Sequence, residues 1–261
     1  MCGIAGIFHP DVPKPVDPAR VVAMADVLAH RGPDGSGVWT APGVGLGHRR
    51  LAIIDLSEGG AQPMLSPDGR EAISYNGEIY NYLEVRAELE EKGFTFRSTS
   101  DTEVILAAWR QWGPDCLAKF NGMFAIALYD ASTDSLFLAR DRLGVKPLFY
   151  AEISDGALIF ASELKGLLAH PLLRRNPSAQ AVEDYLAWGY VPDDASIVEG
   201  VRKLPAGHWL QVRRGRPVPQ PVKWWDVDFS SPVRASVKSL EEEMVERLRE
   251  RTASRMVADV T

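Results

Sequence analysis

Several strand-length segments of this sequence are apolar at nearly every position. Two clear examples are MFAIALY at 123–129 and ALIFA at 157–161. A strand with one face in water alternates apolar and polar side chains, whereas a continuous apolar run is typical of a strand covered on both faces. Runs of strand length lie at 3–8, 45–55 in part, 72–75, 122–129, 136–140, 147–151 and 158–161. The pattern therefore predicts sheets that are covered on both sides.

Helical spacing interrupts these strands at a few points. The segment 18–30 has Asp17 as a candidate N-cap, Pro18 at the first helical position and an apolar face. The other helical segments are 79–92, which stops at Gly93, 101–112, which opens at Asp101, 178–188 and 238–257. Many strands in hairpin-like clusters with a few helices between them predict an α+β fold, in which packed antiparallel sheets are covered by helices.

The composition is that of an ordinary globular protein. The 261 residues are 46% hydrophobic and 25% charged, which supplies a sizeable core. The length exceeds one small domain and is short for two full ones. The net charge of −6 argues against nucleic acid or an anionic membrane as partner, because both favour a basic surface. No apolar run approaches the ~18 residues of a membrane helix.

Two cysteines, Cys2 and Cys116, are too few for a disulfide framework and indicate a reducing compartment. The first residues, MCGIAGIFHPD, lack the basic and long apolar regions of a secretory signal peptide, so we expect a cytoplasmic protein. No metal site is expected, because the histidines do not pair at ligand spacing; they are His9, His30, His48, His170 and His208.

The position of Cys2 gives it a chemistry that Cys116 lacks. If the initiator methionine is removed, which a small second residue permits, Cys2 carries both a thiol and a free α-amine. The ordinary pKa of an α-amine is about 7.7–8.0, so part of it is neutral near pH 7 and can deprotonate the thiol. Nucleophile and base then share one residue. The alternative is a small buried residue that starts a strand, since most free cysteines are inert packing.

A thiol that attacks an amide needs donors for the oxygen that becomes negative. Asn76 and Gly77 follow an apolar run and offer a side-chain amide and a bare backbone N–H. An Asn-Gly turn between a strand and a helix is an equal alternative. An amino-acid substrate also needs one cation and one anion. Arg50 and Asp101 are candidates, although an isolated Arg or an N-cap Asp is more often structural.

A series of motifs follows in order along the chain: MCGIAGIF, HRGPDGSG, GHRRLAIIDL, GAQPM, YNGEIYN, STSDTEVIL, NGMFAIALYD, LARDRLGVKPLFY and FASELKGLL. In this order they resemble the glutaminase domain of glutamine-hydrolysing asparagine synthetases. The resemblance covers roughly residues 2–170, and KLPAGHWL at 203–210 is similar to the end of the same domain.

This resemblance implies an N-terminal-nucleophile (Ntn) hydrolase fold, a four-layer αββα sandwich of antiparallel sheets. It also implies hydrolysis of L-glutamine to glutamate and ammonia through a thioester on the nucleophile Cys2. The other implied roles are oxyanion stabilisation by Asn76 and Gly77, binding of the glutamine α-carboxylate by Arg50 with main-chain contacts from Leu51 and Ile53, and binding of the α-amino group by Glu78 and Asp101.

The resemblance divides the chain into a glutaminase domain at 2–212 and a segment at 213–261. That segment resembles the linker and first helix of an incomplete ATP-dependent synthetase domain. The Ser-Gly-Gly-rich pyrophosphate loop of the family is missing from this sequence, as is a P-loop. We therefore expect no cofactor for the glutaminase half, and ATP and Mg only with the missing synthetase domain or a partner subunit. A homodimer is left open.

The full enzyme would convert aspartate to asparagine with the ammonia released from glutamine. Two alternatives stay open. The domain can serve a different carboxylate acceptor, or the fragment can bind glutamine or a partner subunit without catalysis. A structural expectation concerns Arg140 and Asp141, which end a strand before the LGVKP turn. We expect an ion pair between them to hold that turn.

Overall fold

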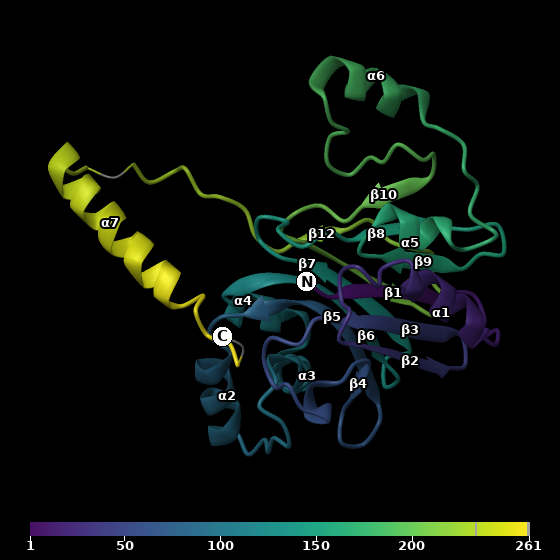
Figure 1. Cartoon of the computed structure of the whole chain (residues 1–261), viewed down its shortest axis with the longest axis horizontal. Helices are drawn as coiled ribbons and strands as arrows, with labels where there is room; N and C mark the ends of the chain where they lie inside the picture. Colours follow the sequence, from purple (N-terminus) through teal and green to yellow (C-terminus); the bar gives the residue numbers. More distant parts are fainter. Residues whose placement is uncertain (233, 260–261) are drawn as a thin grey trace.

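Two six-stranded antiparallel sheets form the body of the protein (Figure 1). The computed structural model describes residues 1–232 and 234–259. The strands are β1 (Gly3–Phe8), β2 (Gly35–Ala41), β3 (Val44–Arg50), β4 (Met64–Leu65), β5 (Glu71–Ile79), β6 (Gly122–Asp130), β7 (Ser135–Arg140), β8 (Phe149–Glu152), β9 (Leu158–Ala161), β10 (Val201–Lys203), β11 (His208–Arg213) and β12 (Val222–Lys223). One sheet has the order β10-β8-β9-β1-β3-β2 and the other β12-β11-β7-β6-β5-β4.

Helices cover the outer faces of both sheets. The helices of the described chain are α1 (Pro18–Asp26), α2 (Tyr82–Glu91), α3 (Asp101–Trp112), α4 (Cys116–Lys119), α5 (Leu164–Leu168), α6 (Ala179–Trp188) and α7 (Val237–Ala253), with 3-10 turns at Glu58–Gly60 and Gly113–Asp115; α1 to α5 are those that cover the sheets. Buried side chains of α1 and α5 pack on the first sheet, and those of α2, α3 and α4 pack on the second. A third apolar cluster fills the space between the sheets. These layers confirm the αββα sandwich.

The apolar runs lie in strands that are covered on both faces, as the sequence predicts. In β1, Ile4 and Phe8 point into the cluster between the sheets, while Ala5 and Ile7 pack towards the outer helices. Because successive side chains of a strand point to opposite faces, both faces of β1 must be apolar. The strand that begins the chain is therefore held at the centre of its sheet, between β9 and β3.

Three predicted helices differ from the structure mainly at one end, and the one predicted at 238–257 ends at Ala253. The helix that starts at Pro18, capped by Asp17 through the N–H of Ala19 at 2.9 Å, ends at Asp26 rather than at residue 30. The predicted helix 79–92 begins at Tyr82, because β5 pairs with β6 as far as Ile79. Consequently Asn76 and Gly77 lie inside a strand, and the alternative of an Asn-Gly turn is wrong.

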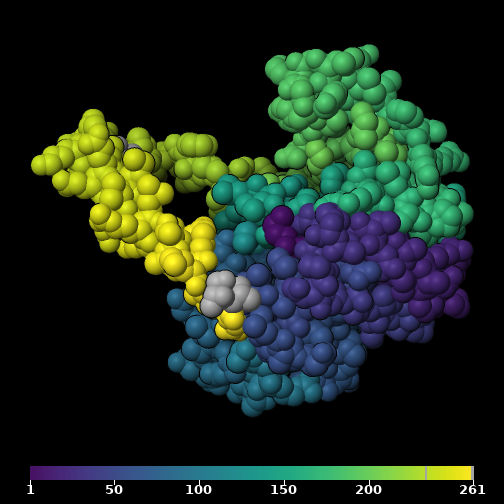
Figure 2. Space-filling view, in the orientation of Figure 1, coloured from purple at the N-terminus to yellow at the C-terminus, as the bar shows by residue number. Residues whose placement is uncertain are grey.

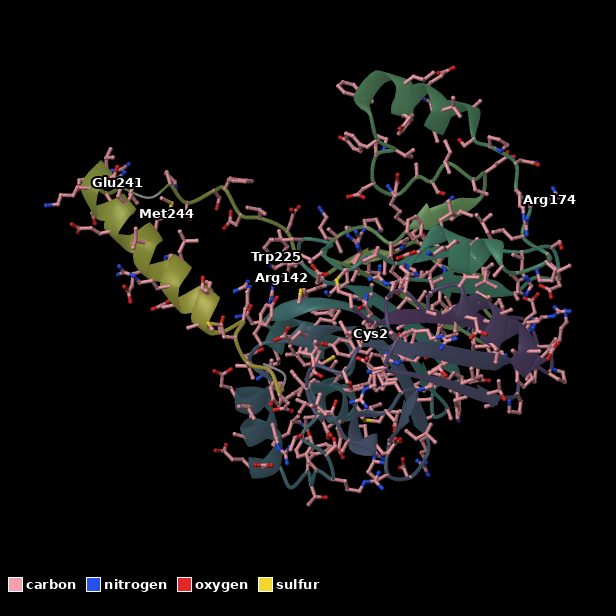
Figure 3. All side chains as sticks on the ribbon, viewed as in Figure 1. Cys2, Arg142, Arg174, Trp225, Glu241 and Met244 are labelled. Carbon is pink, nitrogen blue, oxygen red and sulfur yellow. The ribbon has the colours of Figure 1, made fainter. Side chains whose placement is uncertain are left out.

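The last part of the chain leaves the body after β12, runs through α7 and returns to the body near α2 (Figures 1 and 2). No residue of α7 is buried. Side chains such as Glu241 and Met244 stand out from this helix (Figure 3). Within residues 1–232 and 234–259, none of the helices combines the length and the hydropathy needed to cross a membrane.

Candidate active site

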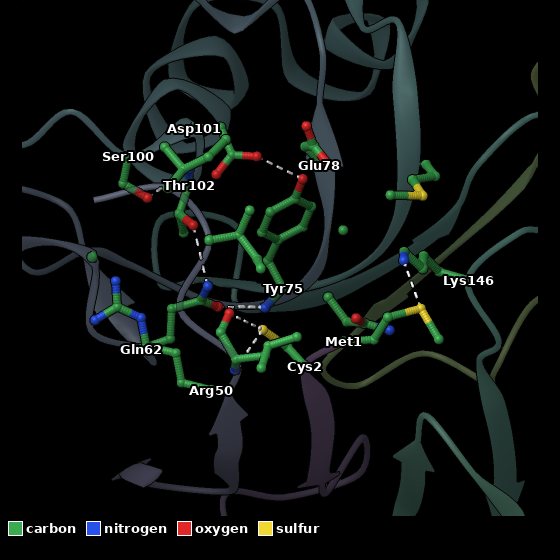
Figure 4. Close-up of a pocket in the computed structure, with 17 residues that line it drawn as sticks. Met1, Cys2, Arg50, Gln62, Tyr75, Glu78, Ser100, Asp101, Thr102 and Lys146 are labelled. Carbon is green, nitrogen blue, oxygen red and sulfur yellow. Dashed lines mark hydrogen bonds between the residues drawn. The ribbon is translucent and has the colours of Figure 1, made fainter. Parts of the chain in front are cut away.

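A cavity of about 220 Å³ opens beside the start of β1 and the last residues of β3 and β5 (Figure 4). Every site residue predicted from the sequence lines it: Cys2, Arg50, Leu51, Ile53, Asn76, Gly77, Glu78 and Asp101. The remaining lining residues are Met1, Ile54, Gly60, Gln62, Tyr75, Ser100, Thr102, Met123 and Lys146. The structure thus brings together residues as far apart in sequence as Met1 and Lys146.

The sulfur of Cys2 is positioned by the main chain of Leu51. The N–H of Leu51 donates to Sγ at 3.4 Å, and the thiol donates to the carbonyl oxygen of Leu51 at 3.6 Å. Burial raises the pKa of the Cys2 thiol, and the hydrogen bond from Leu51 partly opposes this. Since burial favours the neutral thiol, the reaction requires a base close to the sulfur.

Arg31 fixes the backbone of Cys2, and the sequence reasoning did not single it out. Its Nε donates to the carbonyl oxygen of Cys2 at 2.9 Å, and its Nη1 donates to the carboxylate of Glu163 at 2.7 Å. Burial alone would raise the pKa of Glu163, but hydrogen bonds from Arg31, His30 and Lys165 outweigh it and lower the pKa to about 2. The sequence does contain a signal for these two residues, because Arg31 lies in the motif HRGPDGSG and Glu163 in the motif FASELKGLL.

The side chain of Asn76 is 1% exposed, and its oxygen and nitrogen find no hydrogen-bond partner among the described residues. A buried amide without partners is costly, and such groups are concentrated where a ligand supplies the missing bond. Because Asn76 belongs to a cavity that also holds Cys2, its amide is available to an atom that enters beside the sulfur. A buried amide with free hydrogen-bonding capacity is chemically suited to donate to a developing oxyanion.

The backbone of Gly77 adds a second donor. Its partner in β6 is Phe124, whose N–H and C=O both bond to Asp141, so this pair is a non-hydrogen-bonded one and the N–H of Gly77 points away from β6. The neighbouring amides that point the same way, those of Tyr75 and Ile79, bond to Gln62 and Asp101 in the cavity wall. A side chain at Gly77 would collide with the carbonyl oxygen of Met123.

Arg50 supplies the cation of the cavity. Its guanidinium donates to the carbonyl oxygens of Asp55 and, at 2.9 Å, of Ser57, which hold the side chain at the rim. Neither acceptor is a carboxylate, so the positive charge of Arg50 is not neutralised by these contacts. A substrate carboxylate would complete its hydrogen bonds in the bidentate way that Arg favours.

Asp101 and Glu78 supply negative charge to the same cavity. Asp101 accepts hydrogen bonds from the hydroxyl of Tyr75 at 2.8 Å and from the N–H of Ile79 at 3.1 Å. Burial raises the pKa of Asp101 to about 6 despite these donors. Burial, and then the nearby Asp101, also raise the pKa of Glu78, one of whose oxygens is buried without a partner among the described residues. Both carboxylates would gain from a bound cation.

Lys146 and Met1 close the side of the cavity beside Cys2. The Nζ of Lys146 donates to the sulfur of Met1 at 2.8 Å (Figure 4). Lys146 is buried, and this burial lowers the pKa of its ammonium group. Neither residue was predicted as part of the site, although Lys146 lies in the LGVKP segment that the motifs include.

The predicted ion pair between Arg140 and Asp141 is not the interaction that holds the LGVKP turn. Arg140 donates to the carbonyl oxygens of Gly144, Lys146 and Leu204, and the carboxylate of Asp141 accepts from the N–H groups of Phe124, Leu143, Val145 and Lys146. Both charged side chains therefore form hydrogen bonds with backbone groups in and around the turn, instead of pairing with each other. The LGVKP turn, held in this way, places Lys146 in the cavity.

Across the part of the chain that the structure describes, no three His, Cys, Asp or Glu side chains come together as a metal site would require. The second cysteine, Cys116, lies outside the cavity in the core around α3 and α4. Burial raises its pKa strongly, which leaves the thiol protonated and inert.

Comparisons with known proteins show the family to which the chain belongs. A family model described as a glutamine amidotransferase domain matches residues 1–225. Asparagine synthetase [glutamine-hydrolyzing] 1 of Bacillus subtilis is 36% identical over 93% of this chain, and amidase chry2 of Gibberella zeae is 35% identical over all of it. The chain spans 37% and 40% of the length of these relatives.

A solved structure shares the fold. Glutamine phosphoribosylpyrophosphate amidotransferase of B. subtilis superimposes with a TM-score of 0.62 and 19% identity, over 85% of this chain and 49% of that one. The protein has two covered antiparallel sheets and a cysteine just before a central strand. It therefore has the Ntn-type fold of that amidotransferase. Since the family model covers most of the sequence, the chain belongs to the glutamine amidotransferase domain family.

Proposed function

We propose that this domain hydrolyses L-glutamine to glutamate and ammonia, with Cys2 as nucleophile. The observation that carries the proposal is the content of one cavity. It holds a thiol, the amide of Asn76, which has no hydrogen-bond partner among the described residues, a cation at Arg50 and two carboxylates at Glu78 and Asp101. Glutamine carries the complementary groups: a side-chain amide, an α-carboxylate and an α-ammonium. Opposite charges at the amino-acid end orient the amide towards the thiol.

Removal of Met1 is the first requirement, because it frees the α-amine of Cys2 to act as base. The amine takes the thiol proton, and the sulfur forms a bond to the amide carbon. Asn76 and the N–H of Gly77 donate to the oxygen that becomes negative. When the C–N bond breaks, the leaving nitrogen takes a proton from the α-ammonium of Cys2 and departs as ammonia. Water then attacks the thioester, its proton passes to the α-amine, and glutamate and the thiol are released.

We propose further that residues 2–212 form the glutaminase domain and that 213–261 begin a second, ATP-dependent part. In the whole protein, ammonia would amidate aspartate to asparagine, with ATP and Mg bound outside this sequence. The names of two relatives differ: one is an asparagine synthetase and the other an amidase, so the relatives are not all asparagine synthetases by name. A different carboxylate acceptor is therefore the second candidate, and the glutamine site is common to both.

The decisive test combines intact mass and ammonia release. We expect Met1 to be absent from the purified protein, and ammonia to be released from glutamine by the wild type and by Cys116→Ala but not by Cys2→Ala. Cys116 is the matched control because its thiol is buried away from the cavity. Ammonia release by Cys2→Ala would refute the mechanism. Glutamine binding by a processed wild type that releases no ammonia would instead support a non-catalytic glutamine-binding domain.

A further inference from the structure

The segment that follows α7 returns to the rim of the glutamine cavity and binds it at two backbone positions. The N–H of Asp259 donates to the carbonyl oxygen of Ile53 at 2.9 Å. The carboxylate of Asp259 accepts from the N–H of Asp55 at 2.7 Å. These two bonds bracket the loop 53–55, which lies about 200 positions earlier in the sequence. Ile53 itself lines the cavity.

Two neighbouring residues reinforce this attachment. The guanidinium of Arg255 lies 4.5 Å from the centre of the Tyr80 ring, and Val257 packs against the apolar cluster beneath α2 and α3. Tyr80 comes directly after β5, which carries Asn76 and Gly77. The segment 255–259 therefore spans from the end of β5 to the loop that follows β3, the two sides of the cavity mouth. We call this segment the strap.

The residue that the strap binds, Asp55, is under backbone strain. Its φ is 52°, a left-handed conformation that residues other than glycine rarely adopt. Such a conformation persists only when neighbouring groups hold it. The carboxylate of Asp55 accepts from the N–H groups of Ser57 and Thr99, and its own N–H is held by Asp259. The strap thus supplies one of the restraints on this strained position.

Asp55 in turn positions Arg50. Its carbonyl oxygen accepts a hydrogen bond from the Arg50 guanidinium, which is the cation proposed for the substrate carboxylate. A short chain of contacts therefore runs from Asp259 through the backbone of Asp55 to Arg50. Each step is a hydrogen bond, and a shift of the loop would move the acceptor on which the guanidinium rests.

We infer that the strap is a positioning element for the glutamine site, and that Asp259 raises the affinity for glutamine by fixing the loop 53–55 and, through it, Arg50. The inference rests on the proposed function and adds its regulation. Glutamine affinity is coupled to the placement of α7, because the strap directly follows that helix. A movement of α7 would loosen the strap and weaken glutamine binding without any change in Cys2 or Asn76.

Three substitutions at position 259 remove the two hydrogen bonds of Asp259 step by step. Asp259→Asn keeps both the amide donor and an oxygen acceptor, Asp259→Ala removes the acceptor, and Asp259→Pro removes both bonds. Glu241→Ala is the matched control, because it removes an exposed carboxylate from α7 (Figure 3). For each variant we would measure KM and kcat for ammonia release, and the melting temperature. Glutamine Kd would be measured by calorimetry on the same variants combined with Cys2→Ala.

We expect Asp259→Asn and Glu241→Ala to match the wild type. Asp259→Ala should raise KM and Kd by about threefold to tenfold, the effect of one net hydrogen bond, and Asp259→Pro by more, with kcat and the melting temperature unchanged. Equal Kd values across the series, a lower Kd for Asp259→Pro, or a loss confined to kcat would overturn the inference. If the wild type binds glutamine but releases no ammonia, the proposed function fails while the Kd series still decides the role of the strap.

Discussion

The sulfur of Cys2 lies 3.4 Å from the amide nitrogen and 3.6 Å from the carbonyl oxygen of Leu51, so the backbone of the residue that follows β3 positions the thiol through two hydrogen bonds. The two residues are 49 positions apart and meet because β1 and β3 are neighbours, with Gly3 opposite Arg49. The register of two central strands therefore sets the position of the proposed nucleophile. The sheet therefore holds Cys2 in a fixed position for the proposed reaction.

Asn76 should be required for turnover and dispensable for stability. Replacing Asn76 by Ala removes the proposed oxyanion donor and is expected to lower kcat by about 100-fold to 1,000-fold. The free energy of unfolding should not show the loss of a buried hydrogen bond, because the side chain makes none with the described residues. Steady-state kinetics and urea unfolding measure the two effects. An unchanged kcat would remove Asn76 from the mechanism.

Glutamine binding should weaken as the pH falls through about 6. Burial raises the pKa of Asp101 to about 6, and its protonated form can no longer pair with the substrate ammonium. KM measured between pH 5 and 8 should therefore increase on the acid side in the wild type, whereas Asp101→Asn should have a high KM with a much weaker pH dependence near 6. An identical acid limb in Asp101→Asn would assign that titration to another group.

The ionised carboxylate of Asp101 should lower the free energy of unfolding at neutral pH. Because the folded-state pKa of Asp101 lies above its ordinary value of 3.8, its ionisation favours the unfolded chain, and the stability present at low pH is lost as the pH rises through 6. A shift of this size corresponds to about 3 kcal/mol at most. The free energy of unfolding of Asp101→Asn should thus exceed that of the wild type at pH 8, with a smaller difference at pH 4.

Gly60 should be needed for the placement of Arg50. A Cβ at this position would collide with the Arg50 guanidinium and with the carbonyl oxygen of Asp55. We expect Gly60→Ala to raise KM by about tenfold or more while kcat falls less, because substrate binding is affected before chemistry. Gly35→Ala is the control, since its Cβ would lie at an ordinary 3.7 Å from the Arg50 side chain. Equal KM values for both variants would contradict the role of Arg50.

Much of this site could be predicted because its residues lie in local motifs. The apolar runs indicated strands with two covered faces, and the motif order placed Cys2, Arg50, Asn76 and Asp101 in one domain. The helix predicted at 79–92 was wrong at its start, because Ile79, Tyr80 and Tyr82 fit a helix as well as a strand. Pairing of β5 with β6 through Ile79 decides between them, and no local pattern contains that information.

The remaining contacts depend on tertiary structure. Arg31 and Glu163 meet across 132 positions, and Asp55 and Asp259 across 204. A single charged residue in a loop does not reveal its partner, which is why the strap was not predicted. Arg140 illustrates the same limit: its sequence neighbour Asp141 suggested an ion pair, whereas both side chains bond to backbone groups of the turn.

The central claim is that Cys2 carries the acyl group of glutamine. The most direct measurement is to quench the processed protein with acid during turnover of isotopically labelled glutamine, digest it and locate the label by peptide mass spectrometry. The account predicts a base-labile glutamyl adduct on the peptide that begins at Cys2, and none on the peptide that contains Cys116. Ammonia release in the absence of any adduct at Cys2, or an adduct at Cys116, would contradict it.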